Sequence, residues 1–121
     1  MGLDTTHDCW HGAYTAFMRW RAAICEVAGY GDIMKRDGFG EPFTPWPDDD
    51  VLVALLNHSD CSGSLPWEIC GALADRLEEL LPALERKGDG GGHVGHYADK
   101  TRAFIAGLRE AYAVTEDVEF H

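Results

Sequence analysis

The most constraining feature of this chain is one long amphipathic stripe between residues 67 and 84. Apolar side chains recur there at helical spacing, at Trp67, Cys70, Leu73, Ala74, Leu77, Leu80, Leu81 and Leu84. This spacing predicts a helix that buries one face. Pro66 suits the first position of that helix, and Pro82 predicts a kink or a break near its end.

Two other stretches carry helical stripes. Residues 10–28 place apolar side chains at Tyr14, Phe17, Met18, Ile24, Cys25 and Ala28. Arg21 interrupts this stripe, so we place it at the margin, and Gly29 ends the helix. Residues 97–113 direct four apolar side chains inward, namely Phe104, Ile105, Leu108 and Tyr112.

The remaining segments are expected to be short or irregular. Asp48, Asp49 and Asp50 open a short helix over residues 51–57, where acidic side chains suit the positive end of the helix dipole. Alternation at Val118 and Phe120 predicts a short edge strand. The expected fold is therefore mainly α, with α+β as the alternative. It is a small single domain over residues 1–121, with three to four helices and at most a short terminal sheet.

Two glycine-rich stretches separate the predicted helices. Residues 29–47 contain four glycines and three prolines, a composition that opposes long regular elements. The aromatic side chains in this loop indicate that it packs onto the domain, and a loop this long in a small domain is often functional. Residues 88–92 predict a Gly-rich turn.

Charge limits the classes of partner. The chain has 21 acidic and 10 basic residues and a formal net charge of -11. Such a surface repels phosphate backbones and anionic lipids, so we expect no nucleic-acid partner and no membrane partner. The N-terminus lacks secretory signal features and the longest apolar run is too short to cross a bilayer, which favours the cytoplasm.

Polar chemistry is concentrated in two clusters. In residues 4–11, His7 and His11 are four positions apart and would face one way on a helix, a spacing that suits two imidazole ligands of Zn. Asp4 or Asp8 can fix the tautomer of a ligating ring. The structural alternative is that an acid caps the helix and both histidines sit on its first turn.

The second cluster covers residues 57–61. His58 and Asp60 can act together as an acid–base pair or bind a ligand. As structure, Asn57, Ser59 and Asp60 satisfy backbone groups between two helices, an interpretation that does not account for His58 and Cys61. The candidate ligand-binding residues are thus Asp4, His7, His11, His58 and Asp60, and the candidate catalytic residues are Asp8, Asp60 and His58.

The candidate metal ligands are the three clustered histidines, with two cysteines and the terminal histidine as additional donors: His7, His11, His58, Cys9, Cys61 and His121. His121 approaches the first cluster only if the tail pairs beside the N-terminal segment. Cys25 and Cys70 lie on apolar stripes, so we expect them to be core residues.

The motif of residues 2–12, Gly-Leu-Asp-Thr-Thr-His-Asp-Cys-Trp-His-Gly, resembles a family of small uncharacterised proteins of bacteriophages and bacteria. Residues 55–61, residues 74–82 and the final Phe120-His121 resemble the same family. The resemblance carries no activity. It implies a phage-type accessory protein that acts on host factors or host signalling molecules.

Three functional hypotheses follow. The first is a small-ligand-binding accessory protein with a polar His/Asp/Cys pocket that contains Zn or works without it. The second is a metal-assisted hydrolase in which Asp60 or Asp8 acts as base. The third is an acidic protein–protein interaction module, in which the 30–47 loop and the acids at 48–50 contact a basic host protein. Self-association is compatible with each.

Overall fold

The computed structural model describes residues 2–36, 44–59, 62–88 and 96–121. The described helices are α1 (Tyr14–Val27), α2 (Val53–Leu56), α3 (Trp67–Lys87) and α4 (Tyr97–Val114), with short 3-10 turns η1 (Thr6–Asp8) and η2 (Ile33–Lys35). The described strands are β1 (Gly2–Asp4), β2 (His11–Ala13), β3 (Ser64–Leu65) and β4 (Val118–Glu119). The mainly α expectation is confirmed.

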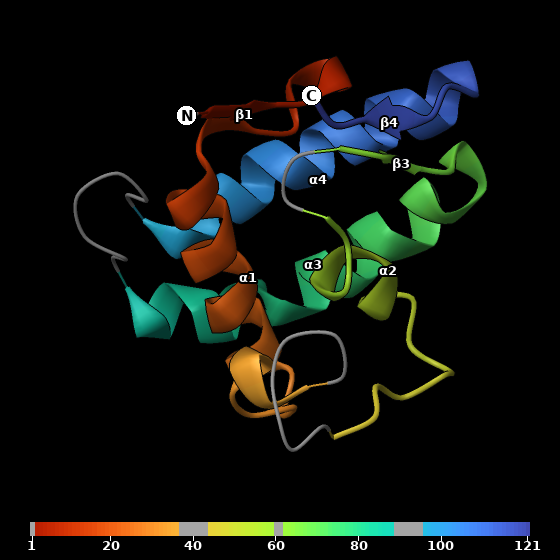
Figure 1. Cartoon of the computed structure of the whole chain (residues 1–121). Helices are drawn as coiled ribbons and strands as arrows, with labels where there is room; N and C mark the ends of the chain where they lie inside the picture. Colours follow the sequence, from red (N-terminus) through yellow and green to blue (C-terminus); the bar gives the residue numbers. More distant parts are fainter. Residues whose placement is uncertain (1, 37–43, 60–61, 89–95) are drawn as a thin grey trace.

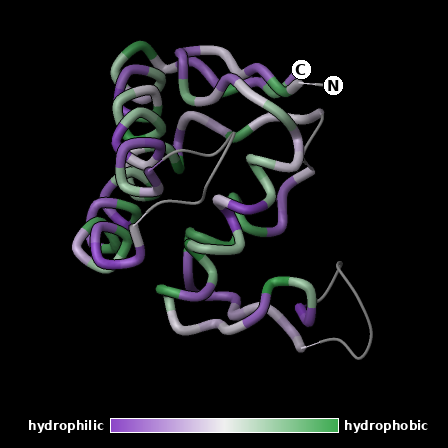
Figure 2. Tube along the Cα trace, turned by 90° about the vertical axis from the view of Figure 1, so that its left-hand side faces the viewer, coloured by the Kyte–Doolittle hydropathy of each residue, from purple (hydrophilic) through white to green (hydrophobic). Residues whose placement is uncertain are grey.

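Helices α3 and α4 lie side by side, and α1 packs against both of them (Figure 1). The core between them is aromatic: the Trp20 ring lies 4.8 Å from Phe104 and 5.2 Å from Trp10, centroid to centroid. The Trp20 indole N–H donates to Thr101 Oγ1 at 2.9 Å, so its buried polar atom is satisfied. The tube of Figure 2 alternates between apolar and polar residues along the helices, as amphipathic helices require.

The predicted stripe of residues 67–84 forms the buried face of α3. Leu73, Leu77 and Leu84 are fully buried. The helix runs through Pro82 to Lys87, so the predicted break there is wrong. Burial of the leucines on either side of Pro82 outweighs the single backbone hydrogen bond that proline removes.

Arg21 is buried, which corrects its expected place at the margin of the stripe. Its guanidinium donates to the carbonyl oxygens of Leu55, Leu56 and His58, at the C-terminal end of α2. The last carbonyls of a helix have no partner within the helix, so a buried cation supplies the missing donors. The guanidinium also lies 4.6 Å from the Phe17 ring centroid.

The two ends of the chain are joined by strand pairing. β1 and β2 form an antiparallel hairpin with Leu3 opposite Gly12, and β3 pairs with β4. Between these sheets, Thr5 pairs with Phe120, and Asp4 and His121 exchange two backbone hydrogen bonds of 2.9 Å. Figures 1 and 2 both show the two termini on the same side of the molecule. The expected terminal strand is confirmed, and the tail also pairs beside the N-terminal segment, which is the condition for His121 to approach the first cluster.

The first helix begins at Tyr14, so the expected start near residue 10 is wrong. Trp10 is buried. Its backbone N–H donates to Thr5 Oγ1 at 2.9 Å, and its backbone carbonyl accepts from the Thr5 N–H at 3.0 Å. These bonds close a loop around η1 and send the chain into β2. His11 therefore lies on a strand, not on a helical turn.

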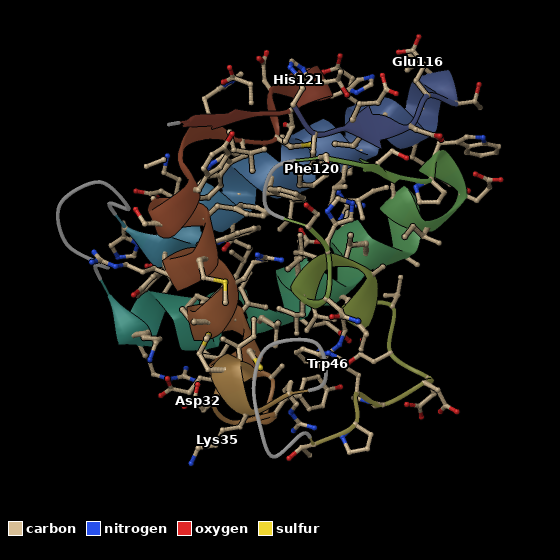
Figure 3. The ribbon with its side chains drawn as sticks, in the orientation of Figure 1. Asp32, Lys35, Trp46, Glu116, Phe120 and His121 are labelled. Atoms are coloured by element: carbon tan, nitrogen blue, oxygen red, sulfur yellow. The ribbon has the colours of Figure 1, made fainter. Side chains whose placement is uncertain are left out.

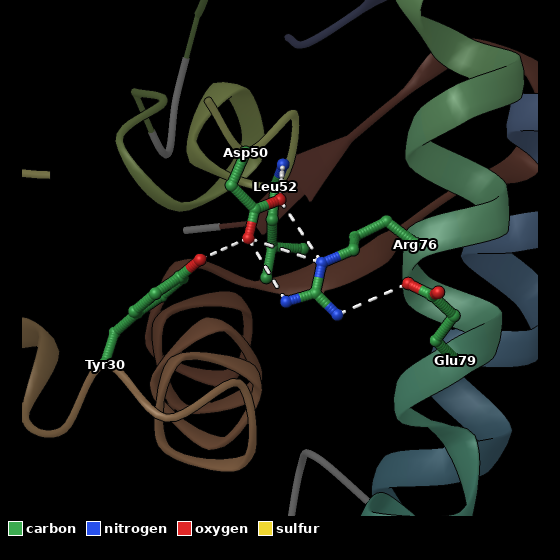
Figure 4. Close-up of polar contacts among 5 residues, drawn as sticks. All are labelled: Tyr30, Asp50, Leu52, Arg76 and Glu79. Carbon is green, nitrogen blue, oxygen red and sulfur yellow. Dashed lines mark hydrogen bonds and ion pairs between the residues drawn. The ribbon is translucent and has the colours of Figure 1, made fainter. Parts of the chain in front are cut away.

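The described parts of the 29–47 loop pack onto the domain. Arg36 donates to the carbonyls of Tyr30 and Pro45 and lies over the rings of Tyr30 and Trp46. The segment is joined to α3 through Asp50, which accepts hydrogen bonds from Tyr30 and Arg76 (Figure 4). The aromatic packing expected from the sequence is thus present in this part of the loop. None of the described helices is long and apolar enough to cross a bilayer.

Candidate functional site

His11 is held by two carboxylates of the N-terminal hairpin. Its Nδ1 lies 2.8 Å from Asp4 Oδ1 and its Nε2 lies 3.0 Å from Asp8 Oδ1. The hydrogen bond to Asp4 and then the one to Asp8 raise the pKa of His11 above its usual value. A ring that donates from both nitrogens carries a proton on each, and a metal ligand needs one nitrogen free.

His7 does not share the partners of His11. It has a positive φ of 62°, its Nδ1 lies 3.1 Å from Thr6 Oγ1, and its Nε2 lies 3.0 Å from Glu116 Oε1. Its side chain is only 9% exposed, whereas the His11 side chain is 56% exposed. The prediction that His7 and His11 share one helical face is therefore wrong, because His7 lies in η1 and His11 lies in β2.

His58 is bound within its own turn. Its ring nitrogens face the carbonyl oxygens of Ser59 and Ser64 at 2.7 and 3.1 Å. The ring stacks on Phe120 with centroids 4.2 Å apart, and a Cβ at Gly63 would lie 3.3 Å from it. The His58 ring thus has backbone carbonyl partners of its own, a structural role that the sequence interpretation did not give it. Asp60 and Cys61, the other candidates there, lie outside the described residues.

The described cysteines are buried free thiols. Burial raises the pKa of Cys9 to about 12 and those of Cys25 and Cys70 to about 11. A thiolate is the reactive and metal-binding form, so these environments oppose both uses. The core placement predicted for Cys25 and Cys70 is confirmed.

The three described cluster histidines contact different partners, and His121 joins the first cluster through its backbone, which pairs with Asp4. Within the described ranges, no group of three His, Cys, Asp or Glu side chains is arranged to hold a metal ion. The described residues thus bring together the N-terminal hairpin and the tail, while each imidazole is engaged separately.

A cleft of about 930 Å³ lies where η1, the start of α3 and the end of α4 meet. Of the candidates predicted from sequence, His7 and Asp8 line it. The cleft has six carboxylates, contributed by separate parts of the chain: Asp8, Glu68, Glu110, Glu116, Asp117 and Glu119. No lysine or arginine is among its described lining residues. Figure 3 shows Glu116 at the far end of α4, remote from Trp46.

Hydrogen bonds hold the walls of this acidic cleft in place. Asp117 Oδ1 accepts a hydrogen bond from the backbone N–H of Trp67 at 2.9 Å, which joins the tail to the first turn of α3. Thr6 Oγ1 accepts the Glu119 N–H at 2.9 Å, which joins η1 to β4. The cleft is therefore built by three segments that are far apart in sequence.

Backbone strain is concentrated at the acidic cleft. Within the described residues, the non-glycine residues with left-handed φ are His7, Asp8 and Thr115, and all three line it. Such conformations cost about 1 to 3 kcal/mol each and persist where the surrounding structure imposes them. They often mark functional sites, which supports a role for this surface.

Apart from His7 and Asp8, the residues that line the acidic cleft are not singled out by the sequence patterns. Glu68 and Glu110 belong to helices that read as ordinary amphipathic helices, and Thr115 gives no signal at all. The acids of residues 116–119 are visible in the sequence as an acidic tail, but their position beside η1 depends on the strand pairing of the termini.

Comparison with family models, with curated proteins and with solved structures found no match.

Proposed function

We propose that this protein is a binding protein whose acidic cleft accepts a cationic ligand, most directly a basic segment of another protein. The observation that carries this proposal is the meeting of six carboxylates around one hollow without a described lysine or arginine beside them. This function combines ligand binding in a polar pocket with the acidic interaction module expected from the sequence.

The contrast with the rest of the acidic surface supports this choice. Several carboxylates elsewhere are paired with cations: Arg109 contacts Asp75 and Glu78, and Arg102 contacts Glu85 and Asp99. Asp50, which the interaction hypothesis places at the binding surface, is paired with Arg76. In the acidic cleft, Glu68, Glu110 and Glu119 form no ion pair with any described residue.

The electrostatic consequence is a concentrated negative potential. Carboxylates that share a hollow repel one another, and a bound cation relieves that repulsion. A cleft of one charge sign also raises the association rate of an oppositely charged partner, and salt screens the effect. The same potential disfavours nucleic acids and anionic lipid surfaces as occupants.

The source of the ligand is proposed from the sequence resemblance. Because the chain resembles small phage-type accessory proteins, we propose that a host protein supplies the basic segment. A cytoplasmic location is consistent with this proposal. A polyamine shares the chemistry of such a segment, and Zn is the ion expected from the histidine clusters.

The test uses the full chain and calorimetry with four probes: a ten-residue peptide of alternating Arg and Gly, its Glu–Gly counterpart, spermine, and Zn²⁺ alone. We expect the basic peptide to bind, the acidic peptide to fail, and affinity to fall as salt rises. Spermine that binds as tightly as the peptide would redirect the proposal to a small cation. Binding of Zn²⁺ alone would favour the metal-containing pocket.

Matched double variants locate the binding surface. Glu110→Gln with Glu119→Gln removes two unpaired charges from the acidic cleft. Asp48→Asn with Asp49→Asn removes two exposed charges elsewhere. Surface charge contacts contribute up to about 1 kcal/mol each, so the first pair should weaken peptide binding roughly five- to thirty-fold. Equal losses from the two pairs would contradict binding in the cleft.

A further inference from the structure

The apolar stripe of α4 predicts Tyr112 inside the core, but its side chain is 48% exposed. The ring lies against α3 at Gly71, where an added Cβ would stand 3.3 Å from Cδ1 and Cε1. Gly71 thus leaves a notch in the surface of α3 into which the ring fits. A glycine inside a helix costs about 1 kcal/mol relative to alanine. The close contact of Tyr112 with α3 therefore depends on a residue that weakens the helix, which argues that the position of the ring is specific.

Trp67 extends this aromatic surface toward the acidic cleft. Its ring centroid lies 5.8 Å from that of Tyr112, with 51° between the ring planes. The backbone N–H of Trp67 donates to Asp117 Oδ1, and Trp67 itself lines the cleft. Tyr112 lines a neighbouring hollow of about 430 Å³. The two rings, which we call the aromatic pair, therefore lie between two hollows.

Charge around the aromatic pair is negative and partly unpaired. Glu68 lines both hollows and has no described cationic partner. The second hollow contains a cation, Arg109, but its guanidinium is bound to Asp75 at 3.0 Å and to Glu78 at 2.8 Å. An exposed aromatic surface beside unpaired carboxylates is complementary to a planar cation. Such a group stacks on the ring and donates hydrogen bonds to the carboxylates.

We propose that the Trp67–Tyr112 pair stacks against a guanidinium group of the bound segment, so that the protein selects arginine-bearing over lysine-bearing partners. This inference rests on the proposed function, because it specifies the ligand of the same site. Arginine offers a flat, weakly hydrated cation with donors in a fixed fork, whereas lysine offers a compact, strongly hydrated charge. The preference should therefore come from the rings, and the overall affinity should come from the carboxylates.

The test measures the ratio of the two dissociation constants for ten-residue Arg–Gly and Lys–Gly peptides on the full chain. Stacking at an exposed ring contributes about 0.5 to 1 kcal/mol, so the arginine peptide should bind roughly two- to five-fold more tightly. Trp67→Leu and Tyr112→Leu should each bring this ratio toward one. Trp67→Phe and Tyr112→Phe keep a ring and should retain most of the preference.

Two controls separate this inference from the proposed function. Glu110→Gln with Glu119→Gln should weaken both peptides equally and leave the ratio unchanged. Tyr14→Leu removes a partly buried tyrosine that does not line either hollow, and it should change neither affinity nor ratio. If Trp67→Leu unfolds the chain, as checked by circular dichroism, the half-exposed Tyr112 still supplies the test.

The outcomes are distinct. A preference for arginine that is lost in the leucine variants supports the aromatic pair as the selecting surface. Equal binding of the two peptides, or a preference that survives both leucine variants, overturns the inference and leaves the proposed function standing. Failure of both peptides to bind overturns the proposed function and this inference with it.

Discussion

Gly107 of α4 lies directly against Cys9, so closely that a Cβ at Gly107 would overlap the Cys9 sulfur. The same Cβ would stand 2.6 Å from the carbonyl oxygen of His7. This contact is where η1 rests on α4, and it brings His7 and Asp8 to the edge of the acidic cleft. The absence of a side chain at one helical position thus helps to shape the proposed binding surface.

Gly107→Ala should destabilise the protein. Alanine favours a helix by about 1 kcal/mol over glycine, but overpacking against backbone and a buried sulfur costs about 1 to 3 kcal/mol. We expect a net loss in the free energy of unfolding, measured by urea denaturation. Gly71→Ala is the matched control, because its neighbour is the half-exposed Tyr112 ring, which can move away. Equal stability of the two variants would show that η1 does not rest on Gly107.

His11 should make the N-terminal hairpin sensitive to pH. Hydrogen bonds to Asp4 and Asp8 raise the pKa of His11 in the folded protein. The stabilisation is complete below the unfolded pKa of about 6.5 and is lost as pH rises through the folded pKa. His11→Gln should therefore lower the free energy of unfolding more at about pH 5.5 than at about pH 9. A difference between variant and parent that is independent of pH would contradict this.

The contact between Asp50 and Arg76 should have the opposite pH dependence. Burial alone would raise the pKa of Asp50, but hydrogen bonds from Arg76, Tyr30 and the Leu52 N–H outweigh it and lower the pKa. Its stabilisation is present above the unfolded pKa and is lost as pH falls through the folded pKa. Arg76→Met should cost roughly 1 to 3 kcal/mol at neutral pH, since it leaves a half-buried carboxylate without its cation.

The control for this pair is Arg102→Met, whose contacts with Glu85 and Asp99 are more exposed. Exposed ion pairs contribute at most about 1 kcal/mol, so this variant should remain close to the parent. Urea denaturation at neutral pH and at about pH 3 compares the variants with the parent. An Arg76→Met deficit that persists at the acid pH would show that the pair does not act through the Asp50 charge.

Cys9, Cys25 and Cys70 should resist alkylation in the folded protein. Burial limits access and raises each thiol pKa to about 11 or 12. We expect little carbamidomethylation of the three sites with iodoacetamide at about pH 8, and complete modification in denaturant. Peptide mass spectrometry reports each cysteine separately. Rapid modification of Cys9 in the folded protein would contradict the burial of its thiol.

Helical periodicity predicted the large elements because their burial is a local property of the sequence. The stripe of α3 follows from the spacing of its apolar residues, and the C-terminal ends of α1 and α3 follow from Gly29 and Gly88. Periodicity does not show which charged side chain will form hydrogen bonds with the backbone of a neighbouring element. Arg21 is buried because the end of α2 presents unpaired carbonyls to it, and that relationship exists only after folding.

The candidate site was predicted only in part, for a similar reason. The polar residues near His7 and His11 were identified, but the hairpin that separates these histidines depends on Trp10 and Thr5 pairing within a loop. The spacing of Tyr112 fits the stripe of α4 and therefore predicts it in the core. The ring instead contacts Gly71 of the adjacent helix, a contact that the spacing within α4 does not show.

The most direct test of the central claim is an NMR titration of the ¹⁵N-labelled protein with the Arg–Gly peptide at low salt. The account predicts saturable shifts of amides that line the acidic cleft, including those of Glu68, Glu110, Thr115 and Glu119. It also predicts reversal of these shifts at high salt. Shifts confined to residues 44–50, or spread evenly over the acidic surface, would contradict the account.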